Sequence, residues 1–321
     1  MVAIGGGTGL STILRGLKQY TEDLTAIVAV SDDGGGSGVL REDLGMPPPG
    51  DIRNCMEALA DTETLMQQLL GYRFPDGRLA GQAFGNLLLA ALDGLSDSFD
   101  QAVTRMSQVL AITGRVLPVT NANVQLEATF ENGSSICGES KISAFKKQQR
   151  CGIHHVRLLP EWPAALPEAV EAIARAEVIL LGPGSLYTSV IPNLLVDGIA
   201  DAIQESRALK IYVCNIMTQE GETEGMSAAD HVAALLEHGG AGLIHMCLCN
   251  SAPVSQSLLE RYSAEYAQPL AVSRRDIEAL GVELVSWPLT DEQSQFARHS
   301  GEKVAQAVME LHKRRASTKI F

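Results

Sequence analysis

Val2-Ala3-Ile4-Gly5-Gly6-Gly7-Thr8-Gly9, the opening stretch of the chain, decides the fold. Its apolar triplet predicts a buried strand, and the apolar residues spaced from Leu10 to Leu17 predict a helix directly after it. Glycines between a strand and a helix leave the first backbone N–H groups of the helix bare, and the partial positive charge there favours anions. We therefore expect this loop to bind a phosphate group.

A plainer interpretation of the same glycines stays open, namely that they only let the helix pack closely on the strand. A strict dinucleotide fingerprint is absent, because Leu10 stands where that pattern has its third glycine.

Similar loops follow three further apolar runs. Ala26–Val30 leads into Ser31–Gly38, Val178–Leu181 leads into Gly182–Ser189, and Lys210–Cys214 leads into Asn215. Loops of small and polar residues at the ends of buried strands are typical of the carboxyl edge of a parallel sheet, where open α/β folds bind ligands. The sequence therefore predicts an α/β, Rossmann-like three-layer fold with a mostly parallel sheet.

The rest of the chain fits one α/β domain over residues 1–321 with a small β-rich insertion at about 116–159. Within the insertion, Asn132-Gly133 predicts a hairpin turn. One helix is expected from near Asp51 through Leu70, after the stop at Pro47–Gly50. Another is expected from Phe84, and its nearly continuous apolar face predicts that the core surrounds it.

Composition excludes several classes of function. The net charge of −13 argues against a broad nucleic-acid surface, and no apolar stretch is long enough to cross a membrane. The large apolar fraction leaves room for an interface, and we expect a homodimer. The six cysteines match no metal-binding spacing, so we expect buried free thiols in a reducing cytoplasm and no structural zinc site.

Acidic residues lie in the second predicted loop and at the start of the helix predicted near Asp51. Asp32 and Asp33 follow a strand, where they can bind a ribose hydroxyl, hold Mg²⁺ or accept a proton. Asp51 either joins them around Mg²⁺ and a pyrophosphate or simply caps a helix. Arg53 either binds a phosphate or pairs with Asp51 or Asp32.

These motifs together resemble the YvcK-like gluconeogenesis factors, relatives of the 2-phospho-L-lactate transferase (CofD) family. The resemblance spans nearly the whole chain. The matching blocks are Gly5–Gly9, Ser31–Gly38, Pro49–Asn54, Phe84–Leu87, Gly138–Glu139, Gly182–Ser189 and Asn215–Gln219.

The resemblance implies a cytoplasmic protein that binds UDP-sugars, chiefly UDP-N-acetylglucosamine, with a role in carbon use, cell-envelope synthesis and cell shape. It implies binding roles for Thr8, Asn215, Tyr262 and Arg298. Tyr262 can stack on the uracil and Arg298 can meet the pyrophosphate, although Tyr266 competes for the first role and Tyr262 also suits an ordinary amphipathic helix. The predicted ligand-binding residues are Gly6, Gly7, Thr8, Gly9, Asp32, Asp33, Ser37, Asp51, Arg53, Asn54, Asn86, Gly184, Ser185, Tyr187, Asn215, Tyr262 and Arg298.

Three functions follow in order of preference. The first is a UDP-sugar-binding regulatory protein without turnover, with Mg²⁺ as the one expected companion of the nucleotide. The second is a transferase acting on a nucleoside-diphosphate-linked donor. The region around Asp32 departs from the aspartate-rich donor loop of the deazaflavin-handling transferases, which disfavours coenzyme F420 chemistry, and no catalytic nucleophile can be chosen from spacing. The third, an NAD-dependent oxidoreductase, rests on fold class alone.

Overall fold

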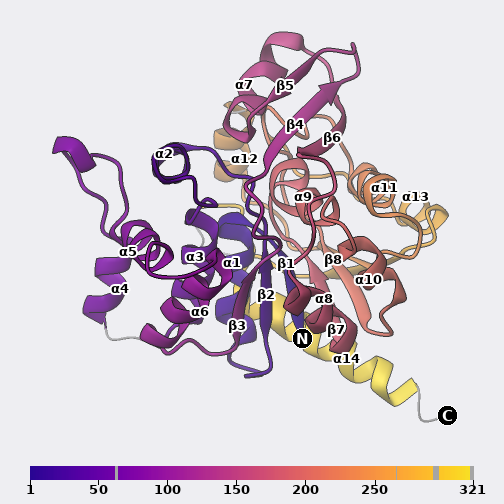
Figure 1. Ribbon diagram of the computed structural model, residues 1–321. Helices are drawn as coiled ribbons and strands as arrows, with labels where there is room; N and C mark the ends of the chain where they lie inside the picture. Colours follow the sequence, from indigo (N-terminus) through magenta and orange to yellow (C-terminus); the bar gives the residue numbers. More distant parts are fainter. Residues whose placement is uncertain (62–63, 265, 292–295, 319–321) are drawn as a thin grey trace.

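The protein is built on a seven-stranded sheet between two layers of helices (Figure 1). The structure is a computed structural model that describes residues 1–61, 64–264, 266–291 and 296–318. The strand order is β10-β9-β8-β7-β1-β2-β3, and each neighbouring pair is parallel. The strands are β1 (Val2–Gly5), β2 (Thr25–Val28), β3 (Arg115–Pro118), β7 (Val178–Leu181), β8 (Leu209–Val213), β9 (Met246–Asn250) and β10 (Glu283–Trp287). The predicted α/β fold with a mostly parallel sheet is confirmed.

Helices occupy most of the connections between these strands. They are α1 (Gly7–Leu17), α2 (Gly35–Leu44), α3 (Gly50–Leu59), α4 (Thr64–Gly71), α5 (Phe84–Asp93), α6 (Phe99–Val109), α7 (Glu139–Gln149), α8 (Pro167–Arg175), α9 (Ile191–Leu194), α10 (Ile199–Glu205), α11 (Ala228–Gly239), α12 (Gln256–Ala264), α13 (Arg274–Ala279) and α14 (Gly301–Thr318). Single turns of 3₁₀ and π-helix lie at Gly77–Leu79 and Leu186–Val190.

The core lies on both faces of the large sheet. On one face α1 packs against α3 and α14, and on the other α8, α9, α10 and α11 form the second layer (Figure 1). Strands covered on both faces have no polar side, which is why β1, β2, β7 and β8 are buried at every position. Their loops at the carboxyl ends therefore meet at one edge of the sheet.

A second, antiparallel sheet stands apart from the first, with order β5-β4-β6 (Figure 1). It consists of β4 (Gln125–Phe130), β5 (Ser135–Cys137) and β6 (Ile153–Leu159), with α7 packed against it. Gly133, at a φ of +81°, makes the predicted hairpin turn between β4 and β5. The stretch from Val116 was predicted to belong to this β-rich part, but β3 instead pairs with β2 in the large sheet, so the small sheet begins at β4.

The two predicted helices differ from the observed ones. The first is divided into α3 and α4, because Ala60 leaves the helix in an extended conformation and bridges to Ile112. The second, α5, is not surrounded by the core. It packs on α4 and α6 rather than on the sheet, so Leu89 is buried while Leu87 and Leu88 are only half-buried.

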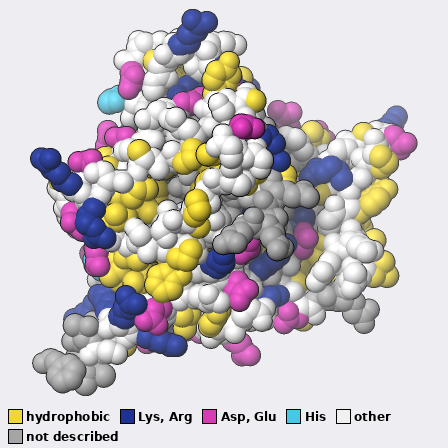
Figure 2. All heavy atoms as spheres, turned by 180° about the vertical axis from the view of Figure 1, so that it is seen from behind, with side chains coloured by type: hydrophobic (Ala, Val, Ile, Leu, Met, Phe, Trp, Pro, Cys, Tyr) yellow, Lys and Arg dark blue, Asp and Glu magenta, His cyan; other side chains and the backbone are white. Residues whose placement is uncertain are grey.

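The surface carries mixed charge over the face seen in Figure 2, where Lys and Arg side chains lie among Asp and Glu side chains and small apolar areas. Within the described residues, each helix is too short or too polar to cross a membrane.

Candidate functional site

The glycine loop places bare backbone at the start of α1. Gly6 is the N-cap of that helix and brings no side chain to it, and Gly7 follows with a φ of +64°, a conformation that favours glycine. A Cβ on Gly9 would overlap the carbonyl group of Pro183. The first turn of α1 therefore lies directly against the loop that follows β7, and both loops border the same space.

That space is a cleft of about 400 Å³ at the carboxyl edge of the sheet. Five separate parts of the chain line it: the glycine loop, the loops after β7 and β8, α12, and the segment before α14. The lining residues are Gly6, Gly7, Thr8, Gly9, Thr12, Pro183, Gly184, Ser185, Ser189, Asn215, Ile216, Met217, Thr218, Gln219, Tyr262, Ala297, Arg298 and His299. The structure thus brings together nine of the predicted residues: the four from Gly6 to Gly9, with Gly184, Ser185, Asn215, Tyr262 and Arg298.

Hydrogen bonds hold the walls of the cleft in place. The Asn215 Nδ2 donates to the Gly184 carbonyl at 3.0 Å, which links the loops after β7 and β8. The Ser185 hydroxyl donates to the Gln219 side chain at 2.7 Å. His299 donates from Nε2 to the Cys214 carbonyl at 3.1 Å, and burial lowers the pKa of His299 to about 4, so its ring is neutral.

Two side chains of the cleft suit a nucleotide. The exposed Arg298 guanidinium lies 4.7 Å from the centre of the Phe296 ring, a cation–π contact that supports its position beside the cleft. Tyr262, on α12, is half-buried and lines the same cleft. Its competitor Tyr266 is 76% exposed and lines a different cavity with Lys146 and Arg150, so the geometry favours Tyr262.

A second, acidic cavity of about 210 Å³ adjoins the cleft and shares Gly7, Ser185, Ser189 and Gln219 with it. Asp32, Asp51 and Glu139 also line this cavity. Burial and the carboxylate of Asp32 raise the pKa of Asp51 to about 6. Burial, with Asp32 and other nearby carboxylates, raises the pKa of Glu139 to about 8. Three carboxyl groups are therefore crowded beside the glycine loop, and the crowding opposes their full ionisation.

These carboxylates can hold Mg²⁺ only together with the phosphate oxygens of a bound ligand. Among the described residues, their oxygens do not converge into a set of three ligands. Mg²⁺, however, is commonly held by one or two carboxylates together with phosphate oxygens and water. Asp32 and Asp51 would hold such an ion against a bound diphosphate, and the ion would neutralise the crowded charge.

The remaining predicted residues lie around the acidic cavity or behind it. Asp33 accepts a hydrogen bond from the Ser140 N–H at 2.7 Å and so joins α7 to the sheet edge, while Ser37 hydrogen-bonds to Asp32. The Tyr187 ring lies near His238, at 6.2 Å between ring centres, while its N–H donates to Glu222 at 2.6 Å. These three residues line neither the cleft nor the acidic cavity.

The Arg53 side chain bonds to residues of its own helix, α3, and of the neighbouring helix α5. Its guanidinium bonds to Glu57 at 2.8 Å, to Asn86 at 3.0 Å and to Asn54 at 2.6 Å. The predicted ion pair with Asp51 or Asp32 is replaced by the pair with Glu57, one helical turn along α3. Arg53, Asn54 and Asn86 thus form a largely buried network that joins α3 to α5.

Several residues of the two cavities escaped the sequence reasoning. Glu139 lies in a block matched to the family, but nothing in its local pattern places it opposite Asp32. Glu139 is the first residue of α7, which packs against the small sheet, and this placement of the helix brings Glu139 to the acidic cavity. Gln219 and His299 likewise enter only through the tertiary fold, although Gln219 follows a recognised strand end.

Comparisons with known proteins identify the family of the chain. The family model described as 2-phospho-L-lactate transferase CofD matches residues 1–290. The gluconeogenesis factor of Halalkalibacterium halodurans is 44% identical over 99% of this chain and 98% of its own, and that of Bacillus subtilis is 45% identical over 96% of each.

A crystal structure of a Bacillus halodurans protein superimposes with a TM-score of 0.92 at 45% identity, covering 96% of this chain and 98% of the other. The chain therefore belongs to the CofD family and groups there with the gluconeogenesis factors.

Proposed function

We propose that this chain is a UDP-sugar-binding regulatory protein of carbon metabolism that acts in the cytoplasm, with UDP-N-acetylglucosamine as its ligand. The observation that supports this best is the meeting of Thr8, Asn215, Tyr262 and Arg298 in one cleft, although they come from four distant parts of the sequence. The name of its relatives supports the role in carbon use, and we extend the proposal to cell-envelope synthesis and cell shape.

The cleft offers each part of such a ligand a suitable surface. The first N–H groups of α1, reached past Gly6 and Gly7, suit the pyrophosphate. Arg298 adds a guanidinium, which binds phosphate through two parallel hydrogen bonds. Tyr262 offers an aromatic face to the uracil. The amide of Asn215 and the hydroxyl of Thr8 can both hydrogen-bond to phosphate or sugar oxygens.

The acidic cavity favours a second candidate, a transferase acting on a nucleoside-diphosphate-linked donor. Glu139, with a pKa near 8, would keep its proton at neutral pH, whereas Asp51 would mostly lose its own. A protonated and an ionised carboxyl group that line one cavity can act as acid and base. The cavity meets the cleft at Gly7 and Ser185, where the diphosphate would lie.

One experiment distinguishes the two candidates. The protein is titrated calorimetrically with UDP-N-acetylglucosamine, with and without Mg²⁺. The nucleotide is then recovered, and its mass is measured by mass spectrometry to detect any conversion. Saturable binding of one ligand per chain, recovered intact, supports the binding protein. A cleaved or transferred ligand supports the transferase. NAD serves as the control nucleotide, and no heat with the UDP-sugar contradicts the proposal.

A further inference from the structure

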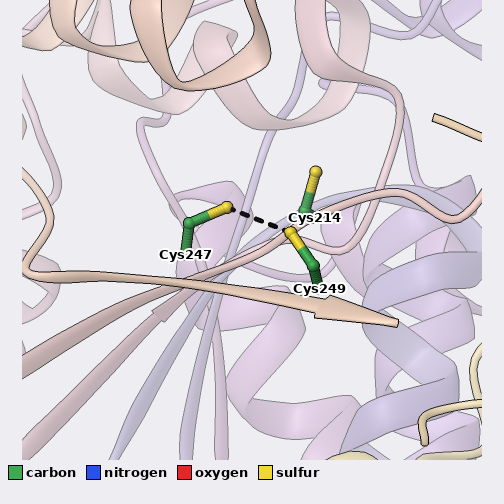
Figure 3. Close-up of side chains that lie close together, drawn as sticks. All are labelled: Cys214, Cys247 and Cys249. Carbon is green, nitrogen blue, oxygen red and sulfur yellow. Dashed lines mark hydrogen bonds between the residues drawn. The ribbon is translucent and has the colours of Figure 1, made fainter. Parts of the chain in front are cut away.

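Three cysteine thiols meet in the interior of the protein, on two neighbouring strands. Cys214 directly follows β8, whereas Cys247 and Cys249 lie in β9. Their sulfur atoms all lie within 4.8 Å of one another, and those of Cys247 and Cys249 are 3.6 Å apart (Figure 3). Among the described residues this is the one group of three or more potential metal-ligating side chains that converges so closely.

The strand register explains why they meet. Parallel pairing of β8 with β9 sets Tyr212 beside Cys247 and Val213 beside Leu248, so Cys214 comes next, beside Cys249. Alternate residues of a strand point to the same face of a sheet, which places Cys247 and Cys249 together. The spacing of the cysteines along the chain could not indicate this, because Cys214 belongs to a different strand.

The cysteine cluster is buried, and a polar side chain contacts one of its sulfur atoms. The three cysteines are at most 2% exposed. The Tyr212 hydroxyl forms a hydrogen bond with the Cys214 side chain and lies 2.9 Å from His231 Nδ1. Burial lowers the pKa of His231 to about 4, so its ring is neutral and can donate from Nδ1 to the tyrosine oxygen. Tyr212 is then free to donate to the sulfur, as outer-shell groups of metal sites do.

One side of the cysteine cluster borders a cavity. Cys249 lines a cavity of about 200 Å³ together with Asn215, Asn250 and Pro253. Cys249 is the one cysteine of the three that borders the cavity, and a metal ion held there could take a water from the cavity as a further ligand.

We propose that Cys214, Cys247 and Cys249 bind one thiophilic metal ion, with Zn²⁺ as the expected occupant. Thiolates select Zn²⁺ over the hard cations Mg²⁺ and Ca²⁺. A Zn–S distance of about 2.3 Å in tetrahedral geometry puts the sulfurs about 3.8 Å apart. The observed separations need only small side-chain rotations to reach that value.

The site adjoins the nucleotide cleft without belonging to it. Asn215 directly follows Cys214 and lines both the cleft and the cavity beside Cys249. His299, another residue of the cleft, holds the Cys214 carbonyl. We therefore expect metal binding to change the affinity of the cleft for nucleotide, although the metal site itself stands independently of the proposed function.

The test uses the full chain, purified under reducing conditions, stripped of metal and titrated with Co²⁺ and then Zn²⁺. We expect one Co²⁺ per chain with an intense sulfur-to-cobalt charge-transfer band, which Zn²⁺ abolishes by displacement. Cys247→Ser should weaken binding more than about 100-fold, because loss of even an outer-shell partner typically weakens metal affinity 10- to 100-fold. Cys137→Ser, a cysteine outside the cluster, should leave it unchanged.

Two further measurements keep the result clear if Cys247→Ser folds poorly. The wild-type cobalt spectrum needs no variant, and Tyr212→Phe retains all three sulfurs while removing the outer-shell hydroxyl, so it should weaken binding 10- to 100-fold. The proposal is overturned if wild-type protein gives no charge-transfer band, or if folded Cys247→Ser binds metal as tightly as wild type. Isolation of the chain with two of these cysteines joined in a disulfide and no bound metal would also overturn it.

Discussion

The carboxylate of Asp51 accepts a hydrogen bond from the backbone N–H of Gly7, at the start of α1. The same carboxylate is so close to the glycine loop that a Cβ on Gly6 would lie 2.8 Å from its Oδ2 atom. The protein therefore holds a negative charge of its own at the helix end that we propose for the pyrophosphate. Whether that charge repels the ligand depends on its protonation or on a neutralising cation.

Affinity for the UDP-sugar should consequently depend on pH in metal-free buffer. Asp51 has a pKa of about 6, so it is ionised at pH 8 and largely neutral at pH 5. We expect binding to tighten as pH falls across this range, by roughly 1 kcal/mol for one unscreened like charge nearby. Asp51→Asn should remove much of this dependence, and the part that stays at the alkaline end belongs to Glu139, whose pKa is about 8. Equal pH dependence in both proteins would exclude this role for Asp51.

Two side chains of the cleft should contribute directly to affinity. Thr8→Ala and Arg298→Ala should each weaken UDP-N-acetylglucosamine binding by about 1–3 kcal/mol, because each removes a hydrogen bond to a charged group. Calorimetry measures the change. The matched controls are Thr104→Ala on α6 and Arg175→Ala on α8, both exposed and remote from the cleft. Unchanged affinity in both cleft variants would place the site elsewhere.

Gly9 should tolerate no side chain. A Cβ there would overlap the carbonyl group of Pro183, so Gly9→Ala must push α1 away from the loop after β7. We expect the free energy of unfolding to drop by about 1–3 kcal/mol, with a marked loss of ligand affinity. Gly71→Ala at the end of α4 is the control, because a Cβ there meets nothing within 4 Å. Two variants of equal stability and affinity would contradict the close packing.

Glu222 should make stability fall as pH rises. It is 4% exposed and accepts the Tyr187 N–H, and burial raises its pKa from 4.5 to about 7. The folded state thus holds a proton that the unfolded state has released between these two values, and this stabilisation is lost as pH rises through 7. Denaturant unfolding at pH 5 to 9 measures it. Glu222→Gln should flatten the profile, whereas the exposed Glu205→Gln should not.

The sequence predicted the parts of the site that depend on local pattern. Strands covered on both faces are apolar throughout, so β1, β2, β7 and β8 stand out in the sequence, and the loops after them must share one edge. The glycine loop and Asn215 were therefore placed correctly by position alone. Their actual contact with a ligand stays a prediction.

Other parts depend on tertiary structure, which local pattern does not express. Tyr262 and Arg298 were implied only by resemblance, because neither follows a recognisable strand. Arg53 was expected either on a phosphate or beside an aspartate, but Glu57 lies one turn away on the same helix and forms the ion pair instead. Glu139 lies in one cavity with Asp32 because of how the insertion packs, and Cys214 lies beside Cys249 because of the strand register. The residues adjacent in sequence predict neither contact.

A crystal structure of the protein grown with UDP-N-acetylglucosamine tests the central claim most directly. We predict the pyrophosphate at the N–H groups of the glycine loop, the uracil against the Tyr262 ring, and the Arg298 guanidinium on a phosphate oxygen. A ligand bound outside this cleft, or a cleft left empty at saturating ligand, would contradict it.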